Sequence, residues 1–337
     1  MELDIQYLLL LQEFRNATGG ILNEFFNALS KFAVDILPFL PFVIFWGVDK
    51  KWGYFFLINH EIGELINGVI KLTVCAYRPW IRSDLIEPAG DSKTAATGYS
   101  FPSGHTRTAT AVYGSTFVWQ KDKRKWLAVL CVILILLTGF SRNFLGVHTP
   151  QDVVVGMLET VLLLFIVSVV SKKVEGNEKL IDILTLVGIV FVFVSLIYIQ
   201  LKPYPMDYDA SGALLVDPNK MMNDCFKACG ACLGFLIGSF VDRHYIKYEI
   251  PFGTKELPVM VAVGMGLVMA WKDLFAPATL VAAFGGHWGH FIARLIMTLF
   301  VMIVWPLVIT KTCVTYEKAK VLYLDMNFRN SNWLRVS

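Results

Sequence analysis

The chain has 337 residues, of which 55% are hydrophobic, 14% aromatic and only 17% charged. Together with a mean hydropathy of +0.56, these fractions exclude an ordinary soluble domain and indicate a polytopic membrane protein. The net charge of +3 is small and dispersed, which argues against a nucleic-acid-binding protein.

Residues 1–31 mix apolar and polar side chains at helical intervals and are interrupted at Thr18-Gly19-Gly20. This pattern predicts one or two amphipathic helices that lie on the bilayer surface. Glu2 and Asp4 stand where a cleavable signal peptide needs basic residues, so we expect no such peptide.

Nine apolar runs follow, and we expect each of them to cross the membrane as a helix. They are Phe32–Val48, Tyr54–Tyr77, Thr106–Trp119, Trp126–Phe144, Val153–Val170, Leu180–Gln200, Met222–Val241, Leu257–Trp271 and Phe291–Ile309. The expected fold is therefore all-α, a polytopic transmembrane helical bundle with about nine spans.

Lys and Arg collect at alternate ends of these runs, near residues 50, 121–125, 172–179 and 243–247 and in the tail. Because short basic loops stay in the cytoplasm, the pattern predicts an external N-terminus and a cytoplasmic C-terminus. We expect a multi-pass integral protein of a bacterial cell membrane. The three polar stretches described next would then lie on the extracytoplasmic side.

The first polar stretch ends the second run, at Lys71-Leu-Thr-Val-Cys-Ala-Tyr-Arg78-Pro79. Lys71 and Arg78 are seven residues apart, so we expect both cations on one face of a helix that Pro79 terminates. The same face continues inward through Asn67, Glu64 and His60. Ionisable residues inside a span are costly and normally face a bundle interior or a wet cavity. The alternative is that the two cations extend to the lipid head groups.

The second stretch, Tyr99-Ser-Phe-Pro-Ser103-Gly104-His105-Thr106, directly precedes the third run. A Ser-Gly turn at a helix N-terminus offers free N–H groups and the positive end of the helix dipole to an anion. His105 follows at once and is placed to give a proton to a group leaving that anion. Taken alone, the stretch could equally be an ordinary turn followed by a surface histidine.

The third stretch runs from Ser141 to Asp152, between the fourth and fifth runs. Thr149-Pro150 predicts a helix start, which would put His148 and Asp152 on one side. A carboxylate that accepts from one imidazole nitrogen leaves the other basic, as a histidine nucleophile or general base requires. Arg142 adds a permanent cation suited to a phosphate oxyanion. The alternative is an interfacial cluster that caps two helices.

The patterns K-x6-R-P, P-S-G-H and S-R-x5-H-x3-D occur once each and in that order. The combination resembles the type 2 phosphatidic acid phosphatase superfamily, which includes lipid phosphate phosphatases, glucose-6-phosphatase and vanadium haloperoxidases. The resemblance covers roughly residues 54–170. It implies a catalytic helical core over residues 32–175, preceded by the interfacial helices 1–31. Additional transmembrane helices would occupy 176–311, and a cytoplasmic tail 312–337.

The resemblance also implies roles for eight residues. His148 would attack phosphorus to form a phosphohistidine, Asp152 would fix its tautomer, and His105 would protonate the leaving oxygen and later activate water. The phosphoryl oxygens would be held by Lys71, Arg78, Ser103, Gly104 and Arg142. Three fixed cations and a helix end can do what Mg²⁺ does elsewhere, so we expect neither a metal ion nor a cofactor.

The predicted function is hydrolysis of a lipid phosphate or isoprenoid pyrophosphate at the external membrane face, with membrane lipids and no nucleic acid as partners. The sequence is compatible with a monomer or an oligomer. One alternative is a phosphotransferase with the same chemistry and an alcohol or sugar acceptor. An alternative of another class is a lipid transporter or scramblase, which the four extra runs and the Glu64-Asn67-Lys71 stripe motivate.

Two further patterns in the second half are interpreted as structural. Cys225, Cys229 and Cys232 recur at helical spacing among small residues, which predicts close helix packing rather than an iron–sulfur site. His287 and His290 are three residues apart beside Trp288, and we expect them in an interfacial belt rather than on a metal.

Overall fold

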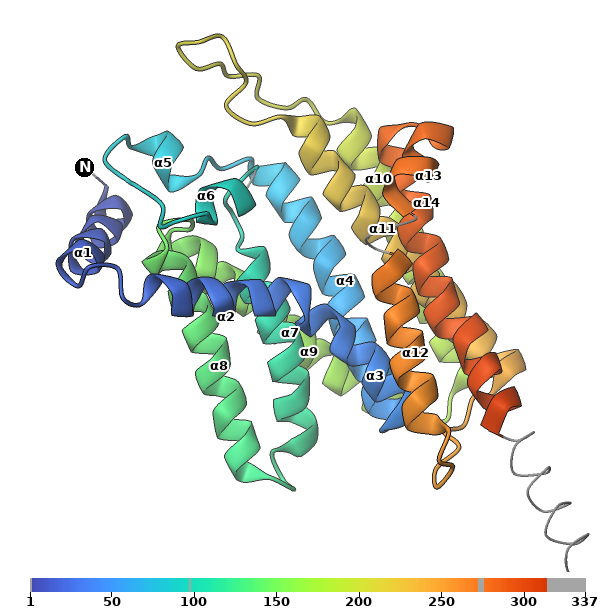
Figure 1. Cartoon of the computed structure of the whole chain (residues 1–337). Coiled ribbons are helices and arrows are strands. Elements are labelled where there is room, and N and C mark those ends of the chain that lie inside the picture. The colour runs from blue at the N-terminus through green and yellow to red at the C-terminus, as the bar shows by residue number, and fades with distance from the viewer. Residues whose placement is uncertain (1, 97, 272–275, 314–337) are drawn as a thin grey trace, which may run out of the picture.

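The computed structural model describes residues 2–96, 98–271 and 276–313, and Figure 1 shows a bundle of helices. Within these ranges there is no β-strand, and a single isolated bridge joins Tyr208 to Leu214. The all-α prediction is confirmed. Of the expected cytoplasmic tail, residues 314–337 lie outside the described residues.

Two helices precede the bundle: α1 (Leu3–Ala17) and α2 (Asn23–Asp35). They separate at the expected break, where Gly19 and Gly20 adopt φ values of 62° and 70° that favour glycine. In Figure 1, α2 runs steeply across the axes of the helices behind it.

The first expected span, Phe32–Val48, is not one uniform α-helix. α2 ends at Asp35, and a 3₁₀ turn, η1 (Leu37–Phe39), connects it to the short α3 (Leu40–Gly47). The change of course coincides with Pro38 and Pro41, which lack the N–H that a continuous α-helix would use.

Four neighbouring helices carry the polar stretches. They are α4 (Lys50–Val74), α7 (Gly104–Gln120), α8 (Lys125–Phe144) and α9 (Pro150–Val174). α7 packs against α4, α8 and α9, so the ends of all four helices can converge. Between α4 and α7 the chain forms two single-turn helices, α5 (Pro79–Arg82) and α6 (Ser92–Ala95).

The loop with α5 and α6 is fixed to the corner between α8 and α9. The Ala89 N–H donates to the Leu145 carbonyl at 3.0 Å. From α1, the buried Arg15 donates to the carbonyls of Phe144 and Glu87. The N-terminal helix therefore ties the loop to this corner.

The second half adds α10 (Glu178–Leu201), α11 (Pro218–Val241), α12 (Leu257–Ala270), α13 (Ala276–Phe284) and α14 (Gly286–Leu299). A π-helical turn, η2 (Asp242–Ile246), extends α11, and another, η4 (Phe300–Val304), continues α14. α11 lies between α4 and α14 and joins the two halves (Figure 1).

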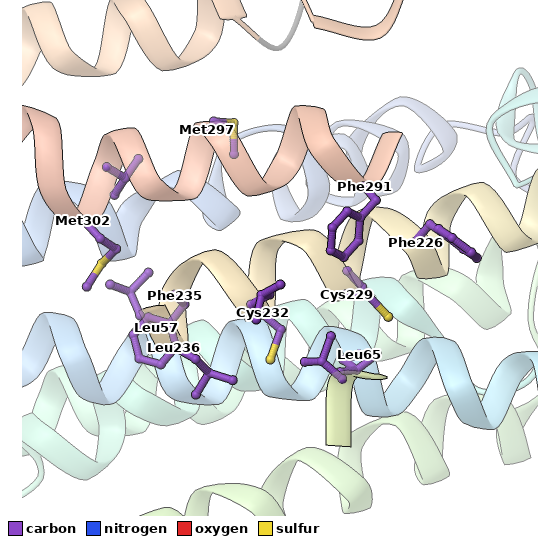
Figure 2. Packing of buried hydrophobic residues seen from close by; sticks show 14 of the residues in the cluster. Leu57, Leu65, Phe226, Cys229, Cys232, Phe235, Leu236, Phe291, Met297 and Met302 are labelled. Carbon is purple, nitrogen blue, oxygen red and sulfur yellow. The ribbon is translucent and has the colours of Figure 1, made fainter. Parts of the chain in front are cut away.

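Small residues on α11 set its distance from both neighbours. A Cβ added to Gly230 would lie 2.2 Å from the Phe291 carbonyl oxygen of α14. On the side toward α4, a Cβ on Gly68 would lie 3.1 Å from the Cys225 sulfur. Figure 2 shows Cys232 of α11 among apolar side chains that face α4. The expected small-residue packing face is present, and all six cysteines are free and buried.

Within the described part of the chain, six helical stretches are long and apolar enough to cross a membrane, so the chain is an integral membrane protein. They are Asn23–Gly47, Lys125–Phe144, Pro150–Val174, Glu178–Leu201, Pro218–Ile246 and Gly286–Cys313. Among the described residues α4, α7 and α12 are helical but do not meet that standard, because α4 and α7 carry many polar residues and α12 is short. The count of nine spans therefore stays a prediction.

Candidate active site

The helix that carries Lys71 ends earlier than its sequence indicates. α4 stops at Val74, where Cys75 adopts a left-handed conformation with a φ of 52°. The extended segment that follows is held by the Ser100 N–H, which donates to the Ala76 carbonyl at 2.7 Å. Arg78 therefore lies outside α4, and Pro79 begins α5 instead of ending α4. The expectation that Lys71 and Arg78 share a helix face is wrong.

Arg78 nevertheless reaches the third polar stretch. Its Nη1 donates to the Val147 carbonyl at 2.9 Å and to the His148 Nε2 at 2.8 Å. Its Nε donates to the Gly98 carbonyl at 3.0 Å, so the guanidinium connects the loop before α7 with the α8–α9 corner. Burial lowers the pKa of Arg78 to about 10, which still leaves it positively charged at neutral pH.

His148 and Asp152 meet as the sequence predicts. Thr149 caps α9, and it forms a reciprocal capping box with Asp152. The His148 Nδ1 lies 3.2 Å from the Asp152 Oδ2, and both residues are only 2–3% exposed. The capping box thus places the carboxylate beside the imidazole.

The hydrogen bonds around His148 assign its tautomer. Arg78 can only donate, so the Nε2 must accept and carries the lone pair. The proton then sits on Nδ1, where it faces the Asp152 carboxylate. Burial and then the positive charge of Arg78 lower the pKa of His148 well below its usual range, and Asp152 only partly opposes them. The imidazole is therefore neutral, with Nε2 as its basic nitrogen.

Two further residues support this pair, and no motif had singled them out. The Ser100 hydroxyl donates to the Asp152 Oδ2 at 2.5 Å. The Asn143 Nδ2 donates to the His148 carbonyl at 2.9 Å. Both lie within the polar stretches, but only the folded chain shows which partner each of them contacts.

The Ser-Gly turn forms the N-terminus of α7 as expected. The Ser103 Oγ caps α7 by accepting from the Thr106 N–H, and the Ser103 N–H donates to the Asp152 carbonyl at 2.9 Å. Gly104 and His105 are the first two residues of the helix, so no carbonyl within it can pair with their N–H groups. A Cβ added to Gly156 would lie 2.7 Å from the Ser103 oxygen. Glycine there lets α9 approach the turn.

Lys71 and Arg142 are held by different parts of the chain. The Lys71 ammonium donates to the Pro102 carbonyl at 2.7 Å and to the carbonyls of Tyr99 and Ser100 at 3.2 and 3.3 Å. Lys71 therefore holds the loop that leads into α7. Arg142 is 3% exposed and donates to the Ser30 hydroxyl of α2. Its Nε has no hydrogen-bond partner among the described residues.

His105 is in the same electrostatic environment. The charges of Arg142, Arg78 and Lys71, together with His148, all act on its ring. His105, Gly104 and Lys71 also line a cavity of about 520 Å³, whereas His148 is buried and is not part of its lining. The structure thus gathers the eight predicted residues around α7's N-terminus. Two imidazoles and three cations there can supply a nucleophile, a proton donor and charge neutralisation to one tetrahedral anion.

Part of this chain matches a known protein family. Residues 54–175 match the family model described as the PAP2 superfamily. This stretch contains the three polar stretches and all eight of the predicted residues. Among solved structures there is no match to the chain.

Similar curated proteins cover only part of the chain. It is 28% identical to the undecaprenyl-diphosphatase of Sulfolobus acidocaldarius, over 41% of this chain and 65% of that protein. It is 26% identical to the phosphatidylglycerophosphatase B of Bacillus subtilis, over 46% and 77%. For the lipid phosphate phosphatase delta of Arabidopsis thaliana the identity is 28%, over 52% and 43%. The chain thus spans less than two thirds of two of these three relatives.

Proposed function

Because residues 54–175 form a PAP2 superfamily domain, we propose that this integral membrane protein is a phosphatase of lipid phosphates or pyrophosphates. Relatives named as undecaprenyl-diphosphatase, phosphatidylglycerophosphatase and lipid phosphate phosphatase support the substrate class. The observation that carries the proposal is the neutral His148, whose Nε2 lone pair lies among buried cations.

The reaction would proceed in two steps. The His148 Nε2 attacks phosphorus and the bond to the leaving oxygen breaks. His105, which the negative charge of the bound phosphate would keep protonated, gives that oxygen its proton. His105 then takes a proton from water, which attacks the phosphohistidine and releases phosphate and the free imidazole. Throughout, the Asp152 carboxylate accepts from Nδ1 and stabilises the positive charge that develops on the ring.

The charge of the transferred group would be neutralised by the protein itself. The proposed phosphate-binding groups are Lys71, Arg78, Arg142, Ser103 and the Gly104 N–H. The buried and unpaired Arg142 Nε supports this role, because an unpaired buried donor is costly unless a ligand accepts from it. With three fixed cations in place, phosphoryl transfer does not require a divalent metal ion.

The site would face the outside of the cell. Basic clusters collect at the ends of the helices opposite the three polar stretches, which supports an external site under the positive-inside rule. A lipid substrate would then present its phosphate at the membrane surface while its chains stay in the bilayer.

Phosphate release tests the proposal. Purified protein in detergent would be given phosphatidic acid, an isoprenoid pyrophosphate and phosphatidylglycerol phosphate, and inorganic phosphate would be measured. We expect release from at least one of them by the wild type and none above background by His148→Ala. An active His148→Ala protein would rule out the phosphohistidine, and a wild type inactive on all three would rule out the substrate class.

A further inference from the structure

The cavity beside His105 extends well beyond the proposed phosphate site. Its volume of about 520 Å³ lies in the usual range for small-molecule pockets. From Lys71 it follows α4 inward to His60, eleven residues away and so roughly 16 Å at 1.5 Å per residue. This depth exceeds what a phosphoryl group alone would occupy.

The two halves of the chain build this cavity together. Glu64 of α4 and Arg107 of α7 line one side, within residues 54–175. Lys227 of α11, together with His290 and Arg294 of α14, lines the other side, outside that range. Figure 2 shows the apolar contact between α4 and α11 that holds the two walls in place. The additional helices thus contribute directly to the space next to His105.

The inner end of the cavity is polar and has unsatisfied hydrogen-bonding atoms. Within the described ranges, no hydrogen-bond partner exists for the Oε2 atoms of Glu61 and Glu64, the Arg107 Nε or either ring nitrogen of His60. His60 is only 3% exposed, and its Nδ1 approaches the Glu61 Oε1 to 3.4 Å without hydrogen-bond geometry. Unpaired buried groups of this kind are costly unless a ligand or ordered water pairs with them.

The chemical nature of these unpaired atoms limits which ligands can bind at the inner end of the cavity. An acyl or isoprenoid chain would leave every one of these groups unpaired. A second phosphate or carboxylate could accept from Arg107 but would face the carboxylates of Glu61 and Glu64. A hydroxyl group both donates and accepts, so a ligand with several hydroxyls can pair with carboxylate and guanidinium together.

A metal ion is the competing occupant. One ligand atom each from His60, Glu61 and Glu64 lies within 4.8 Å of the others, which is a spacing that a cation could bridge. However, the positive charges of Arg107, Arg294 and Lys227 already act on the Glu64 carboxylate. An added divalent cation would be repelled by all three of them, whereas a neutral hydroxylated group would not.

We propose that this cavity binds a hydroxylated leaving group of the phosphate ester, with Glu64 and Arg294 as specificity-determining residues from the two walls. The inference rests on the proposed function, because the leaving oxygen departs on the side of His105, where the cavity begins. The hydroxyls could belong to a glycerol head group of a lipid or to a soluble sugar phosphate. In either case the helices beyond residue 175 take part in selecting the substrate.

The test compares substrates that differ in the leaving group. Phosphatidylglycerol phosphate offers one lipid-borne hydroxyl, a hexose 6-phosphate offers several soluble ones, and phosphatidic acid offers none. Glu64→Gln and Arg294→Gln should each raise KM for the preferred hydroxylated substrate about ten- to a hundredfold, the usual effect of losing a hydrogen bond to a charged group. Their kcat/KM for phosphatidic acid should change less than threefold. Whichever hydroxylated substrate shows the KM effect identifies the source of the hydroxyls.

Asp182→Asn provides the matched control, because Asp182 pairs with Arg243 and His244 at the far end of α11. It should leave all three substrates unaffected. Equal losses for all substrates in Glu64→Gln, or no loss for any, would overturn the proposal. So would a divalent ion that copurifies with the wild type and is absent from Glu64→Gln, since that result would assign the site to a metal.

A binding measurement covers the case in which the variants do not fold or the wild type releases no phosphate. Calorimetry should detect binding of the hexose 6-phosphate or of glycerol 3-phosphate to the wild type, and an excess of the corresponding free polyol should compete with it. Binding without phosphate release would contradict the proposed function, and of this inference it would leave only the cavity as a site for hydroxylated ligands. Phosphate release from phosphatidic acid would support the proposed function. If neither phosphate ester bound and neither polyol competed, this inference would be overturned.

Discussion

The Arg78 Nη1 donates to the His148 Nε2 at 2.8 Å and so occupies the lone pair that would attack phosphorus. The same guanidinium holds the Val147 and Gly98 carbonyls. A phosphoryl group can reach the His148 Nε2 only if Arg78 donates to a phosphoryl oxygen instead of to this nitrogen. Substrate binding would therefore turn the guanidinium from the imidazole to a phosphoryl oxygen and expose the nucleophile in the same movement.

Replacing Arg78 by lysine tests that exchange. Lysine keeps the charge but lacks the planar fork that serves three acceptors at once. We expect Arg78→Lys to lower kcat by about 10²–10³-fold, the range seen when one preorganised donor is lost. Arg82→Lys is the control, because Arg82 lies four residues on and pairs with Asp4 instead. Similar kinetics for the two variants would contradict the role of Arg78.

Asp152→Asn removes the carboxylate while it keeps the size of the side chain. An amide can offer its nitrogen to Nδ1 and favour the tautomer with the proton on Nε2, which cannot attack. We expect kcat to fall by ~10³–10⁴-fold, by analogy with the same change in other catalytic triads. Ser100→Ala, which removes only the hydroxyl bonded to Asp152, should cost about tenfold. If Asp152→Asn were as active as Ser100→Ala, this would argue against control of the His148 tautomer by Asp152.

The pH dependence follows from the lowered pKa of His148. Burial and the charge of Arg78 shift this pKa below the usual 6.5, so the imidazole stays neutral as the pH falls through 6.5. We expect the acid limb of kcat/KM to lie below pH 6.5. In Arg78→Gln one cause of the shift is removed, so the limb should move toward higher pH. A limb above 6.5 in the wild type would mean that another group controls it.

Gly156→Ala should separate α9 from the turn at Ser103. The added Cβ would lie 2.7 Å from the Ser103 oxygen and 3.3 Å from its nitrogen, so the backbone must move. We expect a loss of ~1–3 kcal/mol in stability, as for overpacking, together with reduced phosphate release. Gly266→Ala in α12 meets nothing within 4 Å and should stabilise by ~0.5–1 kcal/mol. Thermal unfolding in detergent would measure both, and equal effects would contradict the close approach.

Activity should persist when metal ions are removed. The proposed transfer relies on Lys71, Arg78 and Arg142 for charge neutralisation, so chelation with EDTA should change kcat less than twofold. The measurement is phosphate release before and after dialysis against the chelator. A loss that Mg²⁺ restores would show that a metal ion takes part.

The helical membrane class, the positions of most helices and the start of α9 all follow from the amino-acid sequence. These features depend on neighbours in the chain: apolar runs long enough to span, the interruption at Gly19-Gly20, and Thr149-Pro150 with Asp152 three residues beyond its cap. The His148–Asp152 pair follows from the same local geometry. The expected helix face shared by Lys71 and Arg78 failed, because the backbone turns at Cys75 and pairs with the loop before α7, a contact between distant segments.

The side chains that meet across the bundle are known only from the folded chain. The Ser100 contact with Asp152, the Ser30 contact with Arg142 and the three carbonyls that hold Lys71 join residues tens of positions apart. Hydrophobic periodicity shows which face of a helix is buried but not which helix covers it. The cavity lined by both Glu64 and Arg294 is the clearest case, because it needs α11 to pack closely against α14 at Gly230 and against α4 at Gly68.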